Sequence, residues 1–381
     1  MSAITHFSSV LTARLAEKMP LIQVLVGPRQ VGKTTAAEEL CRSFPGGAHM
    51  VSADGPTPPN HEWLREHWLR AREMPTPALF IVDEVQKIPG WSEVAKRMFD
   101  EDRSKRDLRV LFLGSSSLAI QRGLTESLAG RFELIRAYHW NFAEMKLGFD
   151  WTLDQYLCFG GYPGAVRFIR EGDIARWQSY IRESILEPVL GKDLAIASSV
   201  SKPALFRQAF ELSMLYPAQE VSYQKLLGQL QERGSHETLK HYLSLFEGAF
   251  LLRQVFRYST RPLSTRTSSP KLLPLAPALI SAFTNPRRLE VDPDWRGRVF
   301  EAAVGAALAR SERELFTWRD GEHEVDFVII RGNTPVAIEI KSGRKKTARG
   351  LDRFLQKFPN ARTVTLTNES ALPVLQGEAI K

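Results

Sequence analysis

The chain has 381 residues, of which 43% are hydrophobic and 25% charged, so it is long enough for several domains with buried cores. Its 51 Lys and Arg outnumber its 43 Asp and Glu, and the net charge of +8 permits nucleic-acid binding without requiring it. Two cysteines, Cys41 and Cys158, argue against a disulfide framework and for a reducing, cytoplasmic setting. No run approaches the ~18 apolar residues of a membrane span, and the first residues lack the pattern of a signal peptide.

The first motif in chain order is a phosphate-binding loop. Residues 27–34 match the pattern G-x-x-x-x-G-K-[ST], between an apolar, strand-like run at 21–26 and a helix-like run at 35–40. Backbone N–H groups in such a loop turn around an anion, and the helix start adds a positive dipole end. We therefore expect Lys33 on the β- and γ-phosphates of ATP and Thr34 on Mg²⁺. The predicted nucleotide-binding residues are Gly27, Pro28, Arg29, Gln30, Val31, Gly32, Lys33, Thr34, Thr35 and Ser115.

A second apolar run, at 78–82, ends directly in Asp83 and Glu84. A buried parallel strand that ends in an acidic pair is typical of phosphate-loop ATPases. This pattern predicts that Asp83 ligates Mg²⁺, through its water shell, and that Glu84 polarises the attacking water. The alternative is a strand that ends in a solvated pair of charges.

A third strand-like run, at 109–113, is followed by serines. Ser115 or Ser116 is a candidate sensor of the γ-phosphate, and the alternative is an ordinary helix cap. Further along, Arg131 is a candidate arginine finger that reaches the nucleotide of a neighbouring subunit. The alternative for Arg131 is a surface or packing arginine.

The middle of the chain reads as mostly helical. Residues 150–200 are broken by the Gly-rich run 160–164, which predicts either a lid next to the nucleotide or a simple turn. Helices expected at 204–216, 222–230 and 235–246, followed by strands within 249–258, indicate a winged helix. The exposed face of its third helix is not strongly basic, so DNA binding and protein packing both remain open. That face is expected to carry Glu237, Lys240, His241 and Ser244.

The C-terminal part combines a helix expected at 295–310, which carries Glu301, with two strand-like runs. Asp326 lies in the first run, and Glu339 and Lys341 lie two residues apart in the second, on one face of a strand. Two carboxylates and a lysine on one surface can hold Mg²⁺ and activate water for phosphodiester hydrolysis. We therefore expect Asp326 and Glu339 as metal ligands and Lys341 as a catalytic group. The alternative is a hairpin with a salt-bridged polar face.

A basic stretch follows this candidate site. Residues 341–362 contain eight Lys and Arg against one acid, Asp352. A phosphate backbone would have to lie beside the metal, so the stretch favours a nucleic-acid contact. A plain solvated face is the alternative.

Taken together, these motifs resemble the bacterial and archaeal AAA+-like P-loop ATPases, related to the STAND signalling ATPases, that carry a winged helix and a PD-(D/E)XK nuclease-like domain. The motifs that carry the resemblance are GPRQVGKTT at 27–35, FIVDEVQKIP at 80–89, FLGSS at 112–116, LAGR at 128–131, GGYP at 160–163, EVDF at 324–327 and IEIKS at 338–342. The resemblance implies an ATP site at Lys33, Thr34, Asp83 and Glu84 and a nuclease-like site at Glu301, Asp326, Glu339 and Lys341. Residues 270–279 depart from the family pattern, in which an acidic residue and a Gly-Leu pair follow Pro-Lys-Leu.

We therefore expect an α/β fold: a parallel-sheet ATPase core (1–148), a helical lid (149–202), a winged helix (203–268) and a nuclease-like domain (269–381). The expected function is an Mg²⁺-dependent ATPase coupled to DNA binding or processing, cytoplasmic and, with a trans arginine, a homo-oligomer. An ATP-switched regulator or scaffold that binds a partner without cleavage is the alternative. A kinase fits less well, because the acidic pair suits water activation better than transfer to a hydroxyl.

Overall fold

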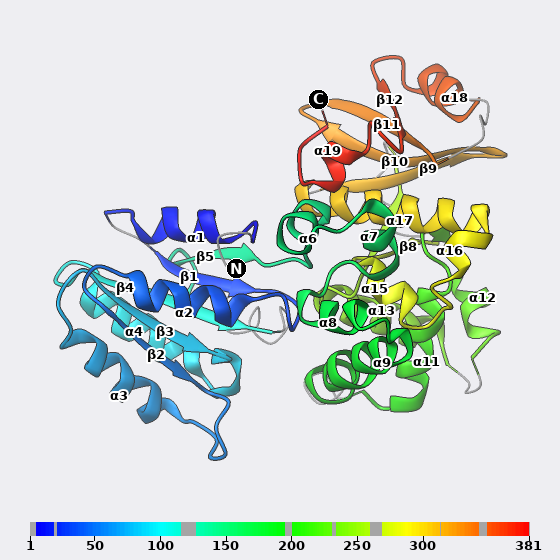
Figure 1. Cartoon of the computed structure of the whole chain (residues 1–381). Coiled ribbons are helices and arrows are strands. Elements are labelled where there is room, and N and C mark those ends of the chain that lie inside the picture. The colour runs from blue at the N-terminus through cyan, green and yellow to red at the C-terminus, as the bar shows by residue number, and fades with distance from the viewer. Residues whose placement is uncertain are drawn as a thin grey trace. The chain divides into compact units, whose positions relative to one another are not determined.

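The computed structural model describes residues 5–18, 21–115, 127–194, 200–230, 234–259, 269–312, 314–342 and 349–380. The chain divides into two compact units, Met1–His139 and Trp140–Lys381 (Figure 1). Ser116 and Arg344, Lys345 and Lys346 of the basic stretch lie outside the described residues, as does most of the loop expected at 261–269. Within the described ranges, no helix combines the length and the apolar character needed to cross a membrane.

The first unit is built on a five-stranded sheet with the order β2-β3-β4-β1-β5, in which every neighbouring pair is parallel. Its strands are β1 (Ile22–Val26), β2 (Ala48–Ser52), β3 (Ala78–Asp83), β4 (Leu108–Gly114) and β5 (Phe132–Arg136). Its helices are α1 (Ser8–Leu15), α2 (Lys33–Ser43), α3 (His61–Arg72), η2 (Val85–Lys87) and α4 (Trp91–Asp102). The predicted α/β class with a parallel sheet, and the strands expected at 21–26, 78–82 and 109–113, are confirmed.

Burial explains why these short apolar runs form the centre of the sheet. Every residue of β1 and β4 is buried, as expected for parallel strands covered on both faces. On one face, Trp68 of α3 packs edge-on against Phe80 of β3, with ring centroids 5.3 Å apart, and Trp91 of α4 packs against Phe112 of β4 at 5.3 Å. Because the strands are parallel, the segments that follow β1, β3 and β4 emerge at one edge of the sheet.

The second unit begins with helices and ends with a mixed sheet. Its helices are α6 (Phe142–Phe149), α7 (Leu153–Phe159), η3 (Pro163–Ala165), α8 (Val166–Arg170), α9 (Ile174–Ser179), η4 (Tyr180–Leu186), η5 (Pro188–Leu194), α11 (Pro203–Met214), α12 (Tyr223–Leu227), α13 (His236–Gly248), α15 (Pro277–Ser281), α16 (Arg288–Val291), α17 (Pro293–Ser311), α18 (Arg349–Lys357) and α19 (Leu372–Leu375). Its strands are β6 (Gln219–Glu220), β7 (Leu252–Arg257), β8 (Lys271–Pro274), β9 (Leu315–Asp320), β10 (His323–Arg331), β11 (Thr334–Lys341) and β12 (Arg362–Thr367).

The three helices expected between residues 204 and 246 are confirmed as α11, α12 and α13. The side chains of Ser222 and Ser235 cap α12 and α13 by accepting hydrogen bonds from backbone N–H groups, as expected for serine at a helix start. Strand β8 pairs antiparallel with both β6 and β7. These helices and strands β6 and β7 lie in the segment expected to form a winged helix, and that assignment stays a prediction.

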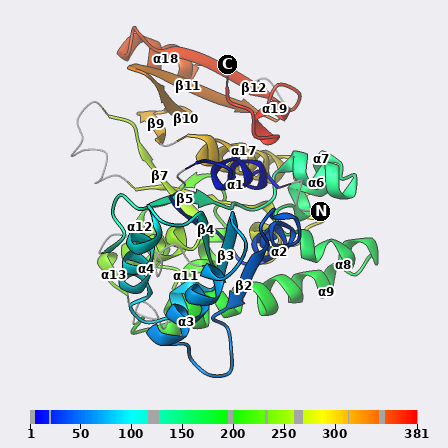
Figure 2. The same ribbon diagram turned by 90° about the vertical axis from the view of Figure 1, so that its left-hand side faces the viewer.

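The C-terminal half of the second unit is a sheet with a helix on each face. Strands β9, β10 and β11 are antiparallel neighbours, and β12 runs parallel to β11. Figures 1 and 2 show α17 and α18 on opposite faces of these strands. Gly305 makes the close approach of α17 possible, because a Cβ there would lie 2.4 Å from the ring of Phe327. On the other face, Phe354 of α18 packs with Trp318 and Val328.

One continuous sheet of seven strands, in the order β12-β11-β10-β9-β7-β8-β6, joins the two parts of this unit. Strand β8 follows the boundary expected at residue 268, yet it pairs with β6 and β7, which precede that boundary. The Gly-rich run at 160–164 forms the turn between α7 and η3, where the Gly161 carbonyl accepts from Trp140 N–H at 3.1 Å. The four domain boundaries and a lid role for this turn stay predictions.

Candidate functional site

The loop between β1 and α2 has the backbone of an anion cradle. Gly32, the residue before α2, has φ 91°, and Gln30 has φ 63°. A glycine adopts such a positive φ at no steric cost. Gly27 is required for a different reason, because a Cβ there would lie only 1.8 Å from the carbonyl oxygen of Ala137. The glycines of the motif therefore permit a close approach and a left-handed turn that other residues would resist.

Lys33 opens α2 and folds its side chain back over this loop. The residue is only 8% exposed, and its Nζ donates to the carbonyl oxygens of Gly27 at 3.0 Å and Pro28 at 2.7 Å. The ammonium thus lies inside the curve of the loop, where an anion held by the loop amides would meet it.

The two predicted ATP motifs meet at Thr34 and Asp83. The Thr34 hydroxyl donates to Asp83 Oδ2 at 2.9 Å, although the residues are 49 positions apart in the sequence. Burial raises the pKa of Asp83 above its ordinary value, against the lowering effect of the Thr34 hydrogen bond. A hydroxyl and a carboxylate placed side by side beside a phosphate loop are the ligand pair that Mg²⁺ takes in ATPases of this type.

Glu84 lies next to this pair and is held by polar neighbours. It adopts a left-handed φ of 54°, and its N–H donates to Asp83 Oδ1 at 2.9 Å. Its carboxylate accepts from the Ser115 hydroxyl, at 3.1 Å, and from the Gln86 side-chain amide. Ser115, the predicted phosphate sensor, therefore contacts the predicted water activator. The sequence analysis assigned no role to Gln86. Its position two residues after Glu84 was the one feature that could have suggested this contact.

Arg131 lies at the end of the sheet where the strands begin, opposite the end that carries the phosphate loop. It precedes β5, and its carbonyl accepts from Ile22 N–H at the start of β1, whereas the phosphate loop follows the end of β1. Its guanidinium binds both carboxylate oxygens of Asp100, at 2.8 and 2.9 Å. Because the strands are parallel, Arg131 is remote from the loop of its own chain. Its role toward the nucleotide of a neighbouring subunit stays a prediction.

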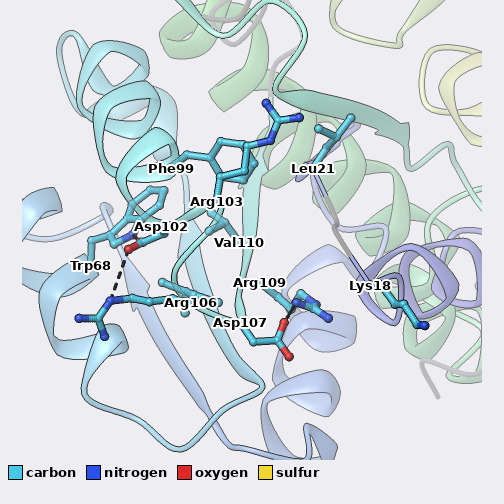
Figure 3. A pocket seen from close by; sticks show the side chains of 11 residues that line it. Lys18, Leu21, Trp68, Phe99, Asp102, Arg103, Arg106, Asp107, Arg109 and Val110 are labelled. Atoms are coloured by element: carbon cyan, nitrogen blue, oxygen red, sulfur yellow. Dashed lines mark hydrogen bonds and ion pairs between the residues drawn. The ribbon is translucent and has the colours of Figure 1, made fainter.

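A pocket also lies at this opposite edge and is distinct from the phosphate loop (Figure 3). Its lining includes Trp68, whose Nε1 donates to Asp102 Oδ2 at 2.8 Å, and Arg109, whose guanidinium donates to the Leu15 and Glu17 carbonyls. These polar groups hold α3 against α4 and β4 against the end of α1, which is a structural role.

The chain segments that flank the phosphate loop add residues that sequence reasoning missed. A Cβ built on Gly32 would contact the Thr5 methyl at 4.0 Å, and Ala137 lies against Gly27. Beside these two contacts, Tyr138 N–H donates to His6 Nε2 at 3.2 Å, and the two rings stack with centroids 6.0 Å apart. His6 and Tyr138 thus follow directly in sequence the two residues that contact the loop glycines, although no motif marks them.

In the second unit, the predicted nuclease-like residues come from adjacent strands. The register pair Phe327↔Ile338 places Asp326 of β10 beside Glu339 of β11, and Asp326 Oδ2 accepts from Ile340 N–H at 2.7 Å. Lys341 lies two residues beyond Glu339 on β11. The expected neighbourhood of Asp326 and Glu339 is thus present, and their roles stay predictions.

Glu301 of α17 reaches the same region but has a partner that the sequence did not suggest. The ammonium of Lys271, on β8, lies 2.7 Å from Glu301 Oε1, 3.4 Å from Glu324 Oε1 and 3.2 Å from the Asp326 carbonyl oxygen. We refer to Glu301, Glu324, Asp326 and Glu339 as the carboxylate cluster. In the sequence, Lys271 belongs to the Pro-Lys-Leu segment. Its position as a single charge within an apolar run was the one sign that it could be buried.

The pKa values in this region reflect burial among like charges. Burial raises the pKa of Glu339 to about 7, with the Asp326 carboxylate as the second cause. Burial pushes the pKa of Glu301 upward, and the Lys271 ammonium, 2.7 Å away, pulls it back toward the charged form. Burial alone would lower the pKa of Lys271, but the carboxylates of Glu301, Asp326 and Glu324 outweigh it and raise that pKa. The ammonium form of Lys271 is therefore the stable one.

Part of the predicted basic stretch is engaged in ion pairs. On α18, Arg353 Nε lies 3.0 Å and Lys357 Nζ 3.8 Å from the carboxylate of Asp320. Among the residues that the structure describes, no group of three or more His, Cys, Asp or Glu side chains is arranged to hold a metal ion.

Comparison with known proteins assigns the first part of the chain. Residues 20–146 match the family described as AAA domain, so this part is a P-loop ATPase-like domain. Residues 150–290 and 296–380 match two further families, each described as a domain of unknown function (DUF8612 and DUF4143).

Three similar proteins are each described as uncharacterized. Proteins of Mycobacterium bovis (Mb2031c) and Mycobacterium tuberculosis (Rv2008c) are each 26% identical over 336 residues, which cover 86% of this chain and 71% of the relative. A protein of Haemophilus influenzae is 22% identical over 48% of this chain and 46% of its own length. A solved structure described as "Structural Basis for Katanin Self-Assembly" is 21% identical with a TM-score of 0.28, over 38% of this chain and 50% of the other.

Proposed function

We propose that the first unit binds Mg²⁺·ATP and hydrolyses it. The observation that carries this proposal is the 2.9 Å hydrogen bond between Thr34, at the end of the phosphate loop, and Asp83, at the end of β3. The AAA match over residues 20–146 supports it. Neither the loop nor the acidic strand end suffices alone, and their meeting forms one site for a triphosphate and its ion.

Each residue of this site has a role that fits its position. The amides of the loop and the start of α2 hold the phosphates, and the Lys33 ammonium neutralises the terminal phosphate charge. The Thr34 hydroxyl and the Asp83 carboxylate fit a hard cation that prefers oxygen ligands, so these two would hold Mg²⁺. When bound, Mg²⁺ would neutralise charge on the phosphate oxygens.

Glu84 is suited to accept a proton from the attacking water. Its carboxylate is oriented by the Ser115 hydroxyl and by the Gln86 amide, and fixed orientation is what makes a general base effective. Transfer to water rather than to a substrate hydroxyl gives ATP hydrolysis.

We further propose that Arg131 acts in trans, which requires a homo-oligomer, and that its ion pair with Asp100 holds the arginine at the strand-start edge.

The experiment is a double assay on the purified full-length chain. The protein is incubated with Mg²⁺ and ATP, alone and with single- or double-stranded DNA, and both phosphate release and strand scission are measured. We expect Mg²⁺-dependent phosphate release. Absence of phosphate release under all of these conditions would refute the ATPase proposal, whatever happens to the DNA.

A nuclease-like role of the second unit is a second candidate function. It is favoured by the adjacent placement of Asp326 and Glu339 on β10 and β11, between α17 and α18. The alternative, a partner-binding scaffold that α11–α13 and β6–β8 would serve as a winged helix, is favoured by α13. There the exposed Lys240 pairs with Glu237 at 3.3 Å instead of presenting an unpaired basic face to DNA.

Replacing Glu339 by alanine distinguishes these two roles. If unit 2 cleaves DNA, Glu339→Ala should remove Mg²⁺-dependent scission, because one of the two strand carboxylates for the ion is lost, while ATP turnover stays at the wild-type rate. Glu369→Ala, an exposed glutamate near the end of the same unit, is the control. Scission that persists at the wild-type rate in Glu339→Ala would show that this carboxylate is structural.

A further inference from the structure

A buried lysine lies within the carboxylate cluster of the second unit. Lys271 exposes only 1% of its side chain, and its ammonium lies 2.7 Å from Glu301 and 3.4 Å from Glu324. It also donates to the Asp326 carbonyl oxygen at 3.2 Å and lies 5.1 Å from the ring centroid of Phe327. A buried ammonium is costly unless carboxylates pair with it, so these contacts are what keep the charge in place.

The backbone of Lys271 is fixed by strand pairing. It lies opposite Glu220 of β6 and Val255 of β7, in the strand between them, whereas its side chain reaches α17 and β10. The positive charge is therefore brought to the cluster by a different part of the unit from the part that supplies the carboxylates. A divalent cation held by the same carboxylates would supply the same kind of neutralising charge.

We propose that Lys271 is the resident cation of the carboxylate cluster and takes, at Glu301 and Glu324, the place that a divalent cation would need. Tight binding of a divalent cation to these two carboxylates then requires the ammonium to leave. The proposal concerns the second unit alone and does not depend on ATP hydrolysis by the first. If Lys271 occupies this place, a metal ion that serves the proposed nuclease-like role would have to be held by Asp326 and Glu339 alone.

The test uses the nucleotide-free full-length chain with Mn²⁺ as the probe. Mn²⁺ binding is titrated by electron paramagnetic resonance, and thermal unfolding is recorded with EDTA and with Mn²⁺. The variant is Lys271→Met, which keeps the length of the side chain and removes its charge. Lys225→Met, on α12, is the control, because that lysine lies over the Tyr216 ring at 4.8 Å and has no carboxylate partner within the part of the chain that the structure describes.

We expect Lys271→Met to melt below the wild type in EDTA, to regain stability in Mn²⁺, and to bind one Mn²⁺ per chain more than the wild type and the control. Any Mn²⁺ bound by the first unit is common to all variants and cancels in this difference. An unchanged Mn²⁺ stoichiometry in a folded Lys271→Met protein would overturn the proposal. So would equal stabilisation of the wild type by Mn²⁺.

A second variant keeps the proposal testable if Lys271→Met does not fold. The double variant Lys271→Met/Glu301→Gln removes one charge of each sign, and we expect it to fold in EDTA and to bind no additional Mn²⁺. Recovery of folding in the double variant would show that charge balance is what the lysine supplies. If the double variant is as unstable as the single one, Lys271 serves packing, and the proposal fails.

Discussion

Replacing Lys33 by alanine is expected to abolish nucleotide binding. The ammonium lies inside the curve of the phosphate loop, within 3.0 Å of the Gly27 and Pro28 carbonyls, so alanine removes a cation that the proposed site places on the phosphates. Charge-assisted hydrogen bonds contribute about 1.5–3 kcal/mol each, and the loss of contacts to two phosphates lowers affinity by a factor of roughly 100 or more. Calorimetric titration with Mg²⁺·ATP measures this loss directly.

Lys87→Ala is the control for this experiment. Lys87 belongs to the same unit and follows Glu84 closely in sequence, but its ammonium pairs with Asp54 and not with the loop. We expect the Lys87 variant to bind ATP as the wild type does. Wild-type ATP turnover by Lys33→Ala would show that the loop is not the phosphate site.

Glu84→Gln is expected to bind ATP and fail to hydrolyse it efficiently. The glutamine retains the size of the side chain and can still contact Ser115, but it cannot accept a proton from water. Loss of a general base typically slows a reaction about 10²–10⁴-fold. Single-turnover phosphate release should fall within this range, while the Kd for ATP measured by calorimetry stays within about threefold of the wild type.

The matched control for Glu84 is Glu93→Gln, a glutamate in the first turn of α4 in the same unit. This variant should hydrolyse ATP at the wild-type rate. If Glu84→Gln instead lost ATP binding along with hydrolysis, Glu84 would be a binding residue, and its assignment as water activator would be wrong.

Much of the first unit could be predicted because its signals are local. Gly27 to Thr34 form one contiguous motif, and Asp83 directly follows an apolar strand. The contact between Thr34 and Asp83 spans 49 residues, but parallel strands that end at one edge bring such segments together. The helix starts at Ser222 and Ser235 were equally predictable. A serine at this position accepts a hydrogen bond from a backbone N–H in the first turn of the helix that follows it.

The rest depends on partners that no local pattern reveals. Lys271 lies in an apolar run, and its charge can be buried because the carboxylates of Glu301 and Glu324, 30 and 53 residues later, reach its ammonium. The Arg131 ion pair with Asp100 likewise joins residues 31 positions apart. A charged residue in the sequence reveals neither the charge of the residues that will surround it nor how deeply it will be buried. These contacts could therefore be identified only in the folded structure.

In the proposed ATPase, one ion and one triphosphate share the site formed by Thr34 and Asp83. The most direct test of this shared site is the electron paramagnetic resonance of Mn²⁺ in the presence of a non-hydrolysable ATP analogue, with wild-type protein and with Asp83→Asn. We predict that the analogue makes the wild type bind one additional Mn²⁺ per chain and that Asp83→Asn weakens this ion at least ~10-fold, because a ligand carboxylate loses its charge. Nucleotide-dependent Mn²⁺ binding that is equally tight in Asp83→Asn would contradict the account.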